Sequence, residues 1–456
     1  MEPVYKWESR HANILSKFVE TLNNEQKKYF ILRNFEGLPE LNNSKDVDII
    51  IAPGSYKSIL PILLECFRVY GLTHYYTMDY ERAHCVYGFD SQTSFSIHID
   101  LIEGYANKGY EILDFNSLYS NTKKYKSFNV LCEHYDAVLL LLYKIIGCKE
   151  LKEKYCTKID YIYKRHGNEV NEILRSILGH NCAAWVIDKL KISDFKEIVF
   201  HSRDIAHAAK QKAFMNNPFK TILGWWNFYS EKAYNMILCP KSVQKMIVVE
   251  APDGTGKTTF IEKLVIKIAE IFVSDISKSR IYHFRPLLLP NLGAVGEKAG
   301  VMKQDTNFTQ PHRAKQANRV SSFIRMIYYW LDYVIGVPLI LRKSAQFDKI
   351  TIFDRYIYDF LVDPRRSRIN LPYWLRRLFT RLVVQPRIVF VLDAPAEVIY
   401  KRKQELTPEE ISRQLKEFRK LSLLGNRYCR LDATKSPEEI ANDAIKIILD
   451  NFTQKL

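Results

Sequence analysis

Residue types that bind phosphate follow one another between Asp253 and Thr259, within the segment MIVVEAPDGTGKTTF of residues 246–260. Glycines let backbone N–H groups turn inward around phosphate oxygens, and a helix that starts there points its positive dipole end at the same anion. Lys257 would add a point charge, and the hydroxyl of Thr258 would hold Mg²⁺ against the outer phosphates of a nucleoside triphosphate. The spacing therefore predicts a nucleotide-binding loop made of Asp253, Gly254, Thr255, Gly256, Lys257, Thr258 and Thr259.

The elements around this loop come in the order that such a site requires. The apolar run Met246–Val249 predicts a buried parallel strand, and apolar residues recur at helical spacing after Lys257. The strict pattern has glycine at position 251, where this chain has Ala251, a change that most turn geometries tolerate. A plain helix start in a basic protein is the alternative, and the strand, loop and helix together favour the phosphate-binding loop.

A second group able to bind a metal lies at the end of another apolar run, Ile350–Tyr356. Ligands of open parallel sheets bind at the carboxyl ends of the strands, so we expect Asp354 to lie beside the loop and its Mg²⁺. Arg355 would then face the transferred phosphoryl group or its acceptor.

The segments PDGTGKTT (252–259) and FDRY (353–356) together resemble the thymidylate kinase branch of the P-loop kinases. The segment RIVFVLDAP (387–395) is similar to that family's fourth strand, and a basic helix expected at Tyr400–Lys420 matches the place of its lid. A closing strand at Tyr428–Leu431 and a helix capped by Ser436 complete the order. The resemblance covers about residues 244–456 and implies an α/β fold with a doubly wound parallel sheet.

The resemblance also implies roles for individual residues. Lys257, Asp354 and Arg355 would be catalytic, with Thr258 and Asp354 holding the metal. The acceptor would be bound by Asp253, Arg285, Arg355 and Tyr356, and lid arginines would clamp the migrating group, for which the candidates are Arg402, Arg413 and Arg419.

The acceptor side departs from the family's pattern. An REPG-type turn is replaced by Phe284–Leu287, and Asp332-Tyr333 stands where the family has a base-reading arginine. Asp359 stands in a region where a serine is common, and the nearby Arg365, Arg366 and Arg368 form either an anion clamp or a solvated basic turn. The residues therefore support phosphoryl transfer more strongly than they support thymidylate, and a nucleoside monophosphate or a phosphorylated sugar is expected as the acceptor.

Carboxylates also gather in the N-terminal part of the chain. Asp46 and Asp48 alternate with apolar residues in a strand that follows another at Tyr29–Arg33, and Asp100 lies in a third strand, Phe95–Ile102. Such carboxylates can hold Mg²⁺ for nucleotidyl transfer, and residues 28–105 resemble the nucleotidyltransferase superfamily. The family's Gly-Ser pair is replaced here by residues 42–45, NNSK, which puts triphosphate binding in doubt. A solvated strand face is the alternative, and His98 is either a partner of Asp100 or a core histidine.

Length and periodicity indicate several domains in the 456 residues. Helical periodicity runs from Tyr135 to about Lys212, and Asn216–Gln244, with its Asn-Pro, Gly-Trp-Trp and Cys239-Pro240 segments, breaks both patterns. We expect an α+β nucleotidyltransferase-like domain at 1–125, a helical extension at 126–215, a junction at 216–243 and the P-loop domain at 244–456. A mobile stretch is expected from Pro286 to about residue 310.

The composition bears on compartment and partners. The first residues, MEPVYKWESRHANIL, lack a secretory signal, and the apolar run Tyr328–Leu341 is short for a membrane span and contains Asp332, so a cytoplasmic chain with a buried helix is expected. The eight cysteines form no CxxC pair, which indicates reduced thiols. A net charge of +16 favours anionic partners.

These observations predict an ATP-dependent P-loop kinase with Mg²⁺, ATP as co-substrate and a small anionic acceptor, and the N-terminal carboxylates add a second, nucleotidyltransferase activity as a further hypothesis. One alternative is an ATP-driven switch or a nucleic-acid-binding ATPase, which the charge favours although the chain has no RNA-recognition motif, zinc finger or basic-aromatic repeat. Another is an active N-terminal nucleotidyltransferase with a degenerate, ATP-sensing kinase domain. The choice between monomer and homodimer stays open.

Overall fold

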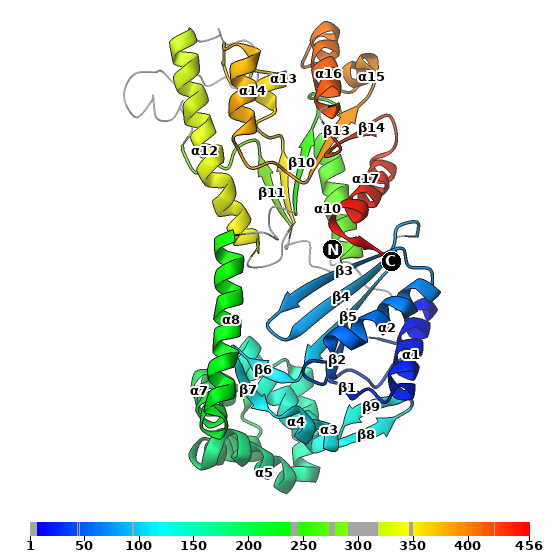
Figure 1. The fold of residues 1–456 in the computed structure, drawn as a ribbon, viewed down its shortest axis with the longest axis vertical. Helices are drawn as coiled ribbons and strands as arrows, with labels where there is room; N and C mark the ends of the chain where they lie inside the picture. The colour runs from blue at the N-terminus through cyan, green and yellow to red at the C-terminus, as the bar shows by residue number, and fades with distance from the viewer. Residues whose placement is uncertain are drawn as a thin grey trace. The chain divides into compact units, whose positions relative to one another are not determined.

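The computed structural model describes residues 7–42, 44, 46–93, 95–238, 245–272, 279–290, 318–345, 350–423 and 425–456 (Figure 1). The chain forms two compact units. One holds the described residues up to Lys232 together with Lys455–Leu456, and the other holds Ala233–Gln454. The division into 1–125, 126–215, 216–243 and 244–456 remains a prediction, and Cys239, Pro240 and residues 291–310 of the expected mobile stretch lie outside the described residues.

The N-terminal unit is built on a mixed sheet with helices on both faces. Its strand order is β15-β3-β4-β5-β2-β1-β9-β8, in which β1 runs parallel to β9 and β2 runs parallel to β5. The strands are β1 (Tyr29–Ile31), β2 (Val47–Ile51), β3 (His74–Tyr80), β4 (Ala83–Asp90), β5 (Phe95–Glu103), β8 (Thr122–Tyr125), β9 (Phe128–Leu131) and β15 (Gln454–Lys455), and β6 (Tyr105–Asn107) and β7 (Tyr110–Leu113) form a separate hairpin.

Successive side chains of β1 and β2 point to opposite faces of this sheet, and both faces are buried. Tyr29 and Ile31 belong to a core shared with α1 (Ser9–Asn24) and α2 (Tyr56–Val69), whereas Phe30 belongs to a second core shared with the later helices. The later helices are α3 (Phe115–Ser120), α4 (Glu133–Leu142), the π-helical η1 (Tyr143–Cys148), α5 (Glu153–Lys191), α6 (Phe195–Phe200) and α7 (Ser202–Asn216). The predicted helical region is therefore present, although residues 126–215 also include strand β9.

The prediction that Asn216–Gln244 interrupts the helical pattern is wrong for most of this segment, because Pro218–Leu238 forms the helix α8. Proline is favoured in the first turn of a helix, and the dipeptide Trp225-Trp226 does not interrupt this one. The ring of Trp225 packs against Tyr110 and Phe214, at centroid distances of 5.2 and 5.8 Å, which fixes α8 within its unit up to Lys232.

The C-terminal unit is built on a five-stranded sheet in which every strand is parallel to its neighbours. The strand order is β11-β12-β10-β13-β14, which is consistent with a P-loop kinase. The strands are β10 (Met246–Glu250), β11 (Arg280–His283), β12 (Thr351–Asp354), β13 (Ile388–Asp393) and β14 (Tyr428–Asp432). All described residues of β10 and β12 are buried, as their apolar runs predicted.

Helices cover this sheet. The helices α10 (Lys257–Ile271) and α17 (Pro437–Phe452) pack together (Figure 1), and the Ser436 side chain caps α17 as expected. A separate core joins α12 (Arg319–Ala345), α13 (Asp359–Val362) and α16 (Pro408–Ser422) to β10, β12 and β13, and α14 (Tyr373–Arg381) packs on α12. The expected single helix at Tyr400–Lys420 is instead two, α15 (Ala396–Arg402) and α16, because Thr407 and Pro408 start a new helix.

Within the described residues, α12 is the helix whose length and apolar composition would suffice to cross a membrane, at Arg319–Ser344. Its inner face includes the fully buried Tyr333 and Val337 of the unit's core. Its outer face is exposed along the helix, so the expectation of a buried helix holds for one face only. The exposed apolar residues are Val320, Phe323, Ile324, Leu331, Ile335 and Leu339.

Candidate functional site

The phosphate-binding loop connects β10 to α10. Gly254 and Gly256 have φ angles of +86° and +93°, in the left-handed region that glycine adopts most readily, and Gly256 is the residue before the first turn of α10. A Cβ on Gly254 would also lie 2.9 Å from the Cβ of Lys403. The hydroxyl of Thr255 donates to the carbonyl of Pro252 at 2.8 Å and so holds the loop itself, whereas Thr258 and Thr259 are exposed.

Two predicted site residues meet at the carboxyl edge of the sheet. Strand pairing places Asp354 between Val249 of β10 and His283 of β11. The Nζ of Lys257 forms an ion pair with the Asp354 carboxylate. The other carboxylate oxygen lies 3.0 Å from Nδ1 of His283. Burial, followed by the nearby charge of Arg355, lowers the pKa of Lys257 despite the attraction of Asp354.

The loop carboxylate of Asp253 is held by two arginines. The Nη2 of Arg355 donates to its Oδ1 at 2.5 Å, and the Nη1 of Arg366 donates to its Oδ2 at 3.0 Å. Burial raises the pKa of Asp253, but the charges of Arg355 and then Arg366 outweigh it, so that the net shift is downward. Arg366 therefore reaches the loop, and the clamp interpretation of its basic segment fits this arginine.

Arg355 is fixed from several sides. It has a φ angle of +70°, which is uncommon outside glycine, and its Nη1 lies 3.2 and 3.3 Å from the two carboxylate oxygens of the fully buried Asp359. The backbone N–H of the next residue, Tyr356, donates to Oε1 of Glu250 at 2.8 Å. Arg355 is thus oriented toward the loop by the protein's own groups.

Glu250 is a site residue that the sequence reasoning missed. It is fully buried at the end of β10, directly before the loop, and burial, followed by the charge of Asp359, raises its pKa well above the ordinary value. The available signal was an acidic residue at the end of an otherwise apolar strand. His283 and the ion-pairing role of Asp359 were also missed, and no spacing in the sequence marks them.

Two predicted acceptor residues have other partners. Arg285 is buried, with Nη1 3.2 Å from Oδ2 of Asp332 and its guanidinium 4.7 Å from the ring centroid of Tyr329. Oδ1 of Asp332 accepts a bond of 2.9 Å from the N–H of Leu289, so this aspartate holds both Arg285 and the following turn. The hydroxyl of the buried Tyr356 donates to the carbonyl of Val384, within the core.

The three lid candidates are placed differently. The Nη1 of Arg402 lies 3.3 Å from the carbonyl oxygen of Thr255 and therefore contacts the loop. Arg413 binds the carboxylate of Glu410 and the carbonyl of Val362, and Arg419 binds Asp393. Of the three, Arg402 is the one that the structure brings to the loop.

The N-terminal unit brings its three predicted carboxylates together. Parallel pairing of β2 and β5 sets Asp48 beside Asp100, and oxygen atoms of Asp46, Asp48 and Asp100 lie within 4.8 Å of one another. Arg33, which the sequence reasoning missed, donates from Nε to Asp48 at 2.7 Å. Burial and the neighbouring Asp46 and Asp100, opposed by Arg33, raise the pKa of Asp48 to about 6.

Residues around this acidic group are also defined in part. The Ser44 hydroxyl lies 2.5 Å from an oxygen of Asp46, while Asn43 and Lys45 lie outside the described residues. His98 lies 2.7 Å from Asp100 through Nε2 and stacks on Tyr87, so it is a buried partner of that aspartate. The described cysteines are free thiols, as expected.

Comparison with known proteins gives distant relatives for the C-terminal half. No protein-family model matches the sequence. The chain is 24% identical over 224 residues to a probable thymidylate kinase of Methanosarcina barkeri and 23% identical over 221 residues to a thymidylate kinase of Oenococcus oeni. Each match covers 45% of this chain, and 96% and 95% of the relatives, respectively. Among solved structures, the thymidylate kinase from Ehrlichia chaffeensis matches with a TM-score of 0.31 and 17% identity, over 45% of this chain and 98% of that one.

Proposed function

We propose that the C-terminal unit is an ATP-dependent phosphotransferase that moves the γ-phosphoryl group of ATP to a nucleoside monophosphate or a related small acceptor. The observation that carries this proposal is the convergence of Lys257, Arg355 and Arg366 on the carboxylates of Asp253 and Asp354, at the carboxyl edge of a parallel sheet. The distant similarity to thymidylate kinases over 45% of the chain supports a nucleotide kinase.

The residues at the loop fit the phosphates of ATP. Lys257 and Arg355 are paired with carboxylates of the strand and the loop. Phosphate oxygens are also anionic acceptors, so they would take the place of these carboxylates. The N–H groups around Gly254 and Gly256 would turn toward the same anion. Thr258 and Asp354 would hold Mg²⁺, which when bound neutralises charge on the phosphates as the phosphoryl group moves.

The chain's own residues would act by position and charge. Lys257 would exchange Asp354 for phosphate oxygens, which frees this carboxylate for the metal. Arg355, held by Asp359 and by the bond from the N–H of the next residue, Tyr356, to Glu250, would exchange Asp253 for the transferring group and stabilise its charge. Arg402, on the carbonyl of Thr255, would help to close the site and exclude water.

The acceptor side supports a substrate other than thymidylate as much as it supports thymidylate itself. Asp332 is fully buried and neutralises Arg285, where the resemblance implies a base-reading arginine. An arginine whose charge is already paired with a buried carboxylate offers less positive charge to the substrate. The acceptor class therefore includes thymidylate, other nucleoside monophosphates and phosphorylated sugars.

The test is ADP production by the full chain with Mg-ATP and a panel of thymidylate, other nucleoside monophosphates and sugar phosphates. Acceptor-stimulated turnover is expected, and Lys257→Ala should reduce it at least about a hundredfold, since it removes a charge aimed at the transferred group. Lys263→Ala, on an exposed part of the same helix, is the matched control and should retain activity.

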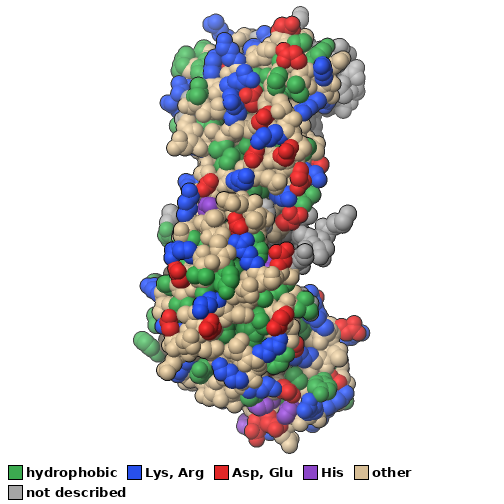
Figure 2. Space-filling model, turned by 90° about the vertical axis from the view of Figure 1, so that its right-hand side faces the viewer, with side chains coloured by type: hydrophobic (Ala, Val, Ile, Leu, Met, Phe, Trp, Pro, Cys, Tyr) green, Lys and Arg blue, Asp and Glu red, His purple; other side chains and the backbone are tan. Residues whose placement is uncertain are grey.

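Slow ATP hydrolysis that no acceptor stimulates would instead support an ATP-driven switch or a nucleic-acid-binding ATPase. On the face that Figure 2 shows, basic and acidic side chains are interspersed, without one continuous basic field. Such a face does not favour nucleic acid as the partner.

A second candidate function belongs to the N-terminal unit, which we propose to be nucleotidyltransferase-like. The observation that favours it is the group of Asp46, Asp48 and Asp100, whose donor oxygens suit Mg²⁺. Transfer of labelled nucleotide from the α-phosphate of a nucleoside triphosphate should be lost in Asp46→Asn and Asp48→Asn and retained in Lys257→Ala. Transfer that depends on Lys257 instead would remove this function from the N-terminal unit.

A further inference from the structure

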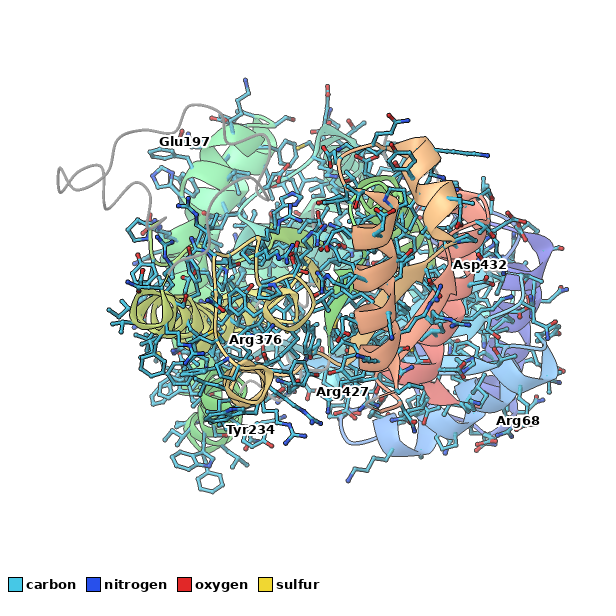
Figure 3. All side chains as sticks on the ribbon, turned by 90° about the horizontal axis from the view of Figure 1, so that it is seen from above. Arg68, Glu197, Tyr234, Arg376, Arg427 and Asp432 are labelled. Atoms are coloured by element: carbon cyan, nitrogen blue, oxygen red, sulfur yellow. The ribbon has the colours of Figure 1, made fainter. Side chains whose placement is uncertain are left out.

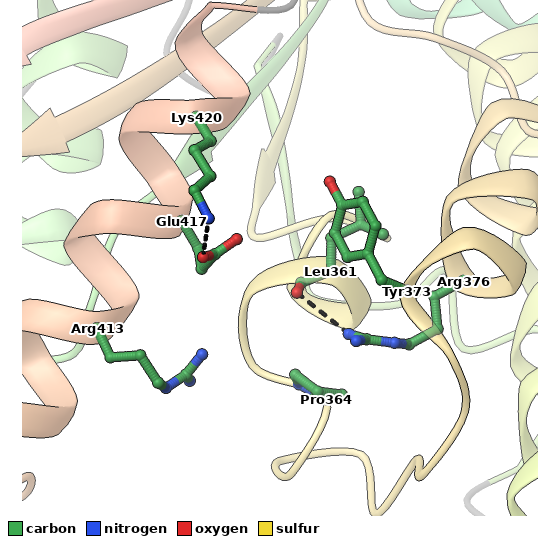
Figure 4. A pocket seen from close by; sticks show the side chains of 7 residues that line it. All are labelled: Leu361, Pro364, Tyr373, Arg376, Arg413, Glu417 and Lys420. Carbon is green, nitrogen blue, oxygen red and sulfur yellow. Dashed lines mark hydrogen bonds and ion pairs between the residues drawn. The ribbon is translucent and has the colours of Figure 1, made fainter.

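A pocket of about 430 Å³ lies outside both candidate sites, between α13, α14 and α16 (Figure 4). Its volume suits a small ligand, because such sites span roughly 300 to 1,000 Å³. None of its residues belongs to the phosphate-binding loop or to the acidic group of the N-terminal unit. It is lined by Leu361, Pro364, Tyr373, Arg376, Arg413, Glu417 and Lys420.

Arg376, which is labelled in Figure 3, is the cation that α14 contributes to this pocket. Its Nη1 donates to the carbonyls of Phe360 and Leu361, at 2.6 and 3.1 Å, and its Nε donates to the carbonyl of Leu371 at 3.0 Å. Over the part of the chain that the structure describes, no carboxylate lies within ion-pair distance of this half-buried guanidinium. A charge withdrawn from water usually has a counter-charge, and here the guanidinium is held by carbonyl dipoles, by the ring of Tyr373 at 5.7 Å from its centroid and by the field of the nearby Glu417, without a directly paired carboxylate.

The neighbouring charges leave this excess positive charge on Arg376. Arg413 and Lys420 line the same pocket and are paired with Glu410 and Glu417, at 2.7 and 2.6 Å. Burial, together with the like charge of Arg413, lowers the pKa of Arg376. The three cations of the wall therefore stand against two carboxylates, Glu410 and Glu417, and the excess of one positive charge belongs to Arg376.

The apolar part of the wall suits the organic part of a ligand. Figure 4 shows the ring of Tyr373 beside Leu361 on one side, with the charged groups of α16 opposite. Tyr373 is 43% exposed, with the Arg376 guanidinium over its ring at 5.7 Å from the centroid, so the ring offers a ligand apolar contact beside that cation. The pocket thus combines an anion-binding side and an apolar side.

We propose that this pocket binds a phosphate-bearing ligand, with the phosphate between Arg376 and Lys420 and the organic part against Tyr373 and Leu361. Among the described residues, Nη2 of Arg376, unlike Nε and Nη1, has no carbonyl partner, and it is the group that would donate to the phosphate. The site is distinct from the phosphate-binding loop, since neither Lys257 nor Arg355 lines it.

Two sources share this phosphate chemistry. One is a soluble phosphate ester, and the other is the headgroup of an anionic phospholipid. The second would bring α14 to a membrane surface, and Trp374 and Leu378 of this helix are 66% and 47% exposed. Aromatic and apolar side chains beside arginines are typical of helices that lie in a membrane interface.

The experiment uses the full chain with Lys257→Ala, so that the phosphate-binding loop contributes little and kinase activity is not the readout. One arm measures the affinity of inorganic pyrophosphate by calorimetry. The other measures co-sedimentation with vesicles of phosphatidylcholine, with and without phosphatidylglycerol. Lys420→Glu and Arg376→Lys should weaken binding at least about fivefold, because one reverses a charge at the wall and the other removes the guanidinium fork.

Lys416→Glu is the matched control, because Lys416 is exposed on the same helix and does not line the pocket. Binding in the first arm alone identifies a soluble ligand, and binding in the second arm identifies a lipid headgroup; both support the site. Saturable binding of neither probe, or equal weakening by Lys416→Glu and Lys420→Glu, would overturn the proposal. Lys420 is 57% exposed, so its variant is expected to fold and carries the test if Arg376→Lys does not.

Discussion

At the scale of single residues, two carboxylates of the C-terminal site are each shared by two basic side chains. Asp253 has each oxygen bound to a different arginine, from the segment after β12 and from the segment after α13. Asp354 is shared between Lys257 and His283. The pairs of Asp253 with its two arginines and of Asp354 with Lys257 each join a cation and an anion that a bound triphosphate and its metal would separate, so the protein's own groups hold these charges at the loop.

Arg366 is the residue for which this view makes a specific prediction. Arg366→Ala should lower kcat with the best acceptor at least about tenfold, because it removes a cation that the structure directs at the loop. The free energy of unfolding should change by less than about 1 kcal/mol, since the ion pair with Asp253 is partly exposed. Assays of ADP production would measure the change in kcat, and urea unfolding would measure the change in the free energy of unfolding.

Arg365→Ala is the control for that prediction, because Arg365 is exposed in the same segment. Equal activity of the two variants and the wild type would assign the basic segment to a solvated turn. A large loss of stability in Arg366→Ala would show that the pair with Asp253 acts in folding instead.

At the scale of elements, sequence periodicity predicted the C-terminal sheet well. The runs Met246–Val249 and Ile350–Tyr356 correspond to β10 and β12, since strands buried on both faces are almost wholly apolar. The hairpin of β3 and β4 was not predicted, because its tyrosines, histidines and small residues give no clean alternation. The helix α8 was missed because glycine beside two tryptophans indicated a break, whereas tertiary packing holds the helix.

The candidate site could be predicted only where its residues belong to one local pattern. Residues 253–259 lie in a single loop, so their spacing alone indicates phosphate binding. The pairing of Arg366 with Asp253 joins positions 113 residues apart, and the pairing of Arg285 with Asp332 joins positions 47 apart. Such pairs depend on how strands and helices assemble, and a single sequence contains no local signal for them.

The packing of α8 on the β6–β7 hairpin leads to a prediction about stability. A Cβ on Gly224 of α8 would overlap the carbonyl oxygen of Gly109 in the β6–β7 hairpin, and Gly109 itself has a φ angle of +85°. Gly224→Ala should therefore lower the stability of the N-terminal unit by about 1 to 3 kcal/mol, even though alanine favours a helix more than glycine does. Chemical unfolding of the variant would measure this loss.

Gly167→Ala is the matched control for that packing argument. Gly167 lies in the helix α5, and a Cβ there would meet only ring atoms of Tyr163, at 3.9 Å or more. This variant should be neutral or more stable by up to about 1 kcal/mol. Stabilisation by Gly224→Ala as well would show that α8 does not pack closely on the hairpin.

At the scale of the whole molecule, each unit has its own sheet and its own cores. A unit that buries its own apolar residues can unfold as a cooperative body, and a ligand stabilises only the body that binds it. Calorimetry of the full chain should therefore show two unfolding transitions. Mg-ATP at about a hundred times its Kd should raise the midpoint of one of them by roughly 5 to 10 °C, which corresponds to about 2.7 kcal/mol.

The identity of the shifted transition separates the functional alternatives. If the C-terminal unit is the kinase, Lys257→Ala should abolish the shift, and Asp48→Asn should leave it in place. A shift that Asp48→Asn abolishes would instead place nucleotide binding in the N-terminal unit, on its acidic group. A single transition that moves as a whole would contradict independent units, and the two candidate activities would then have to be treated as properties of one cooperative structure.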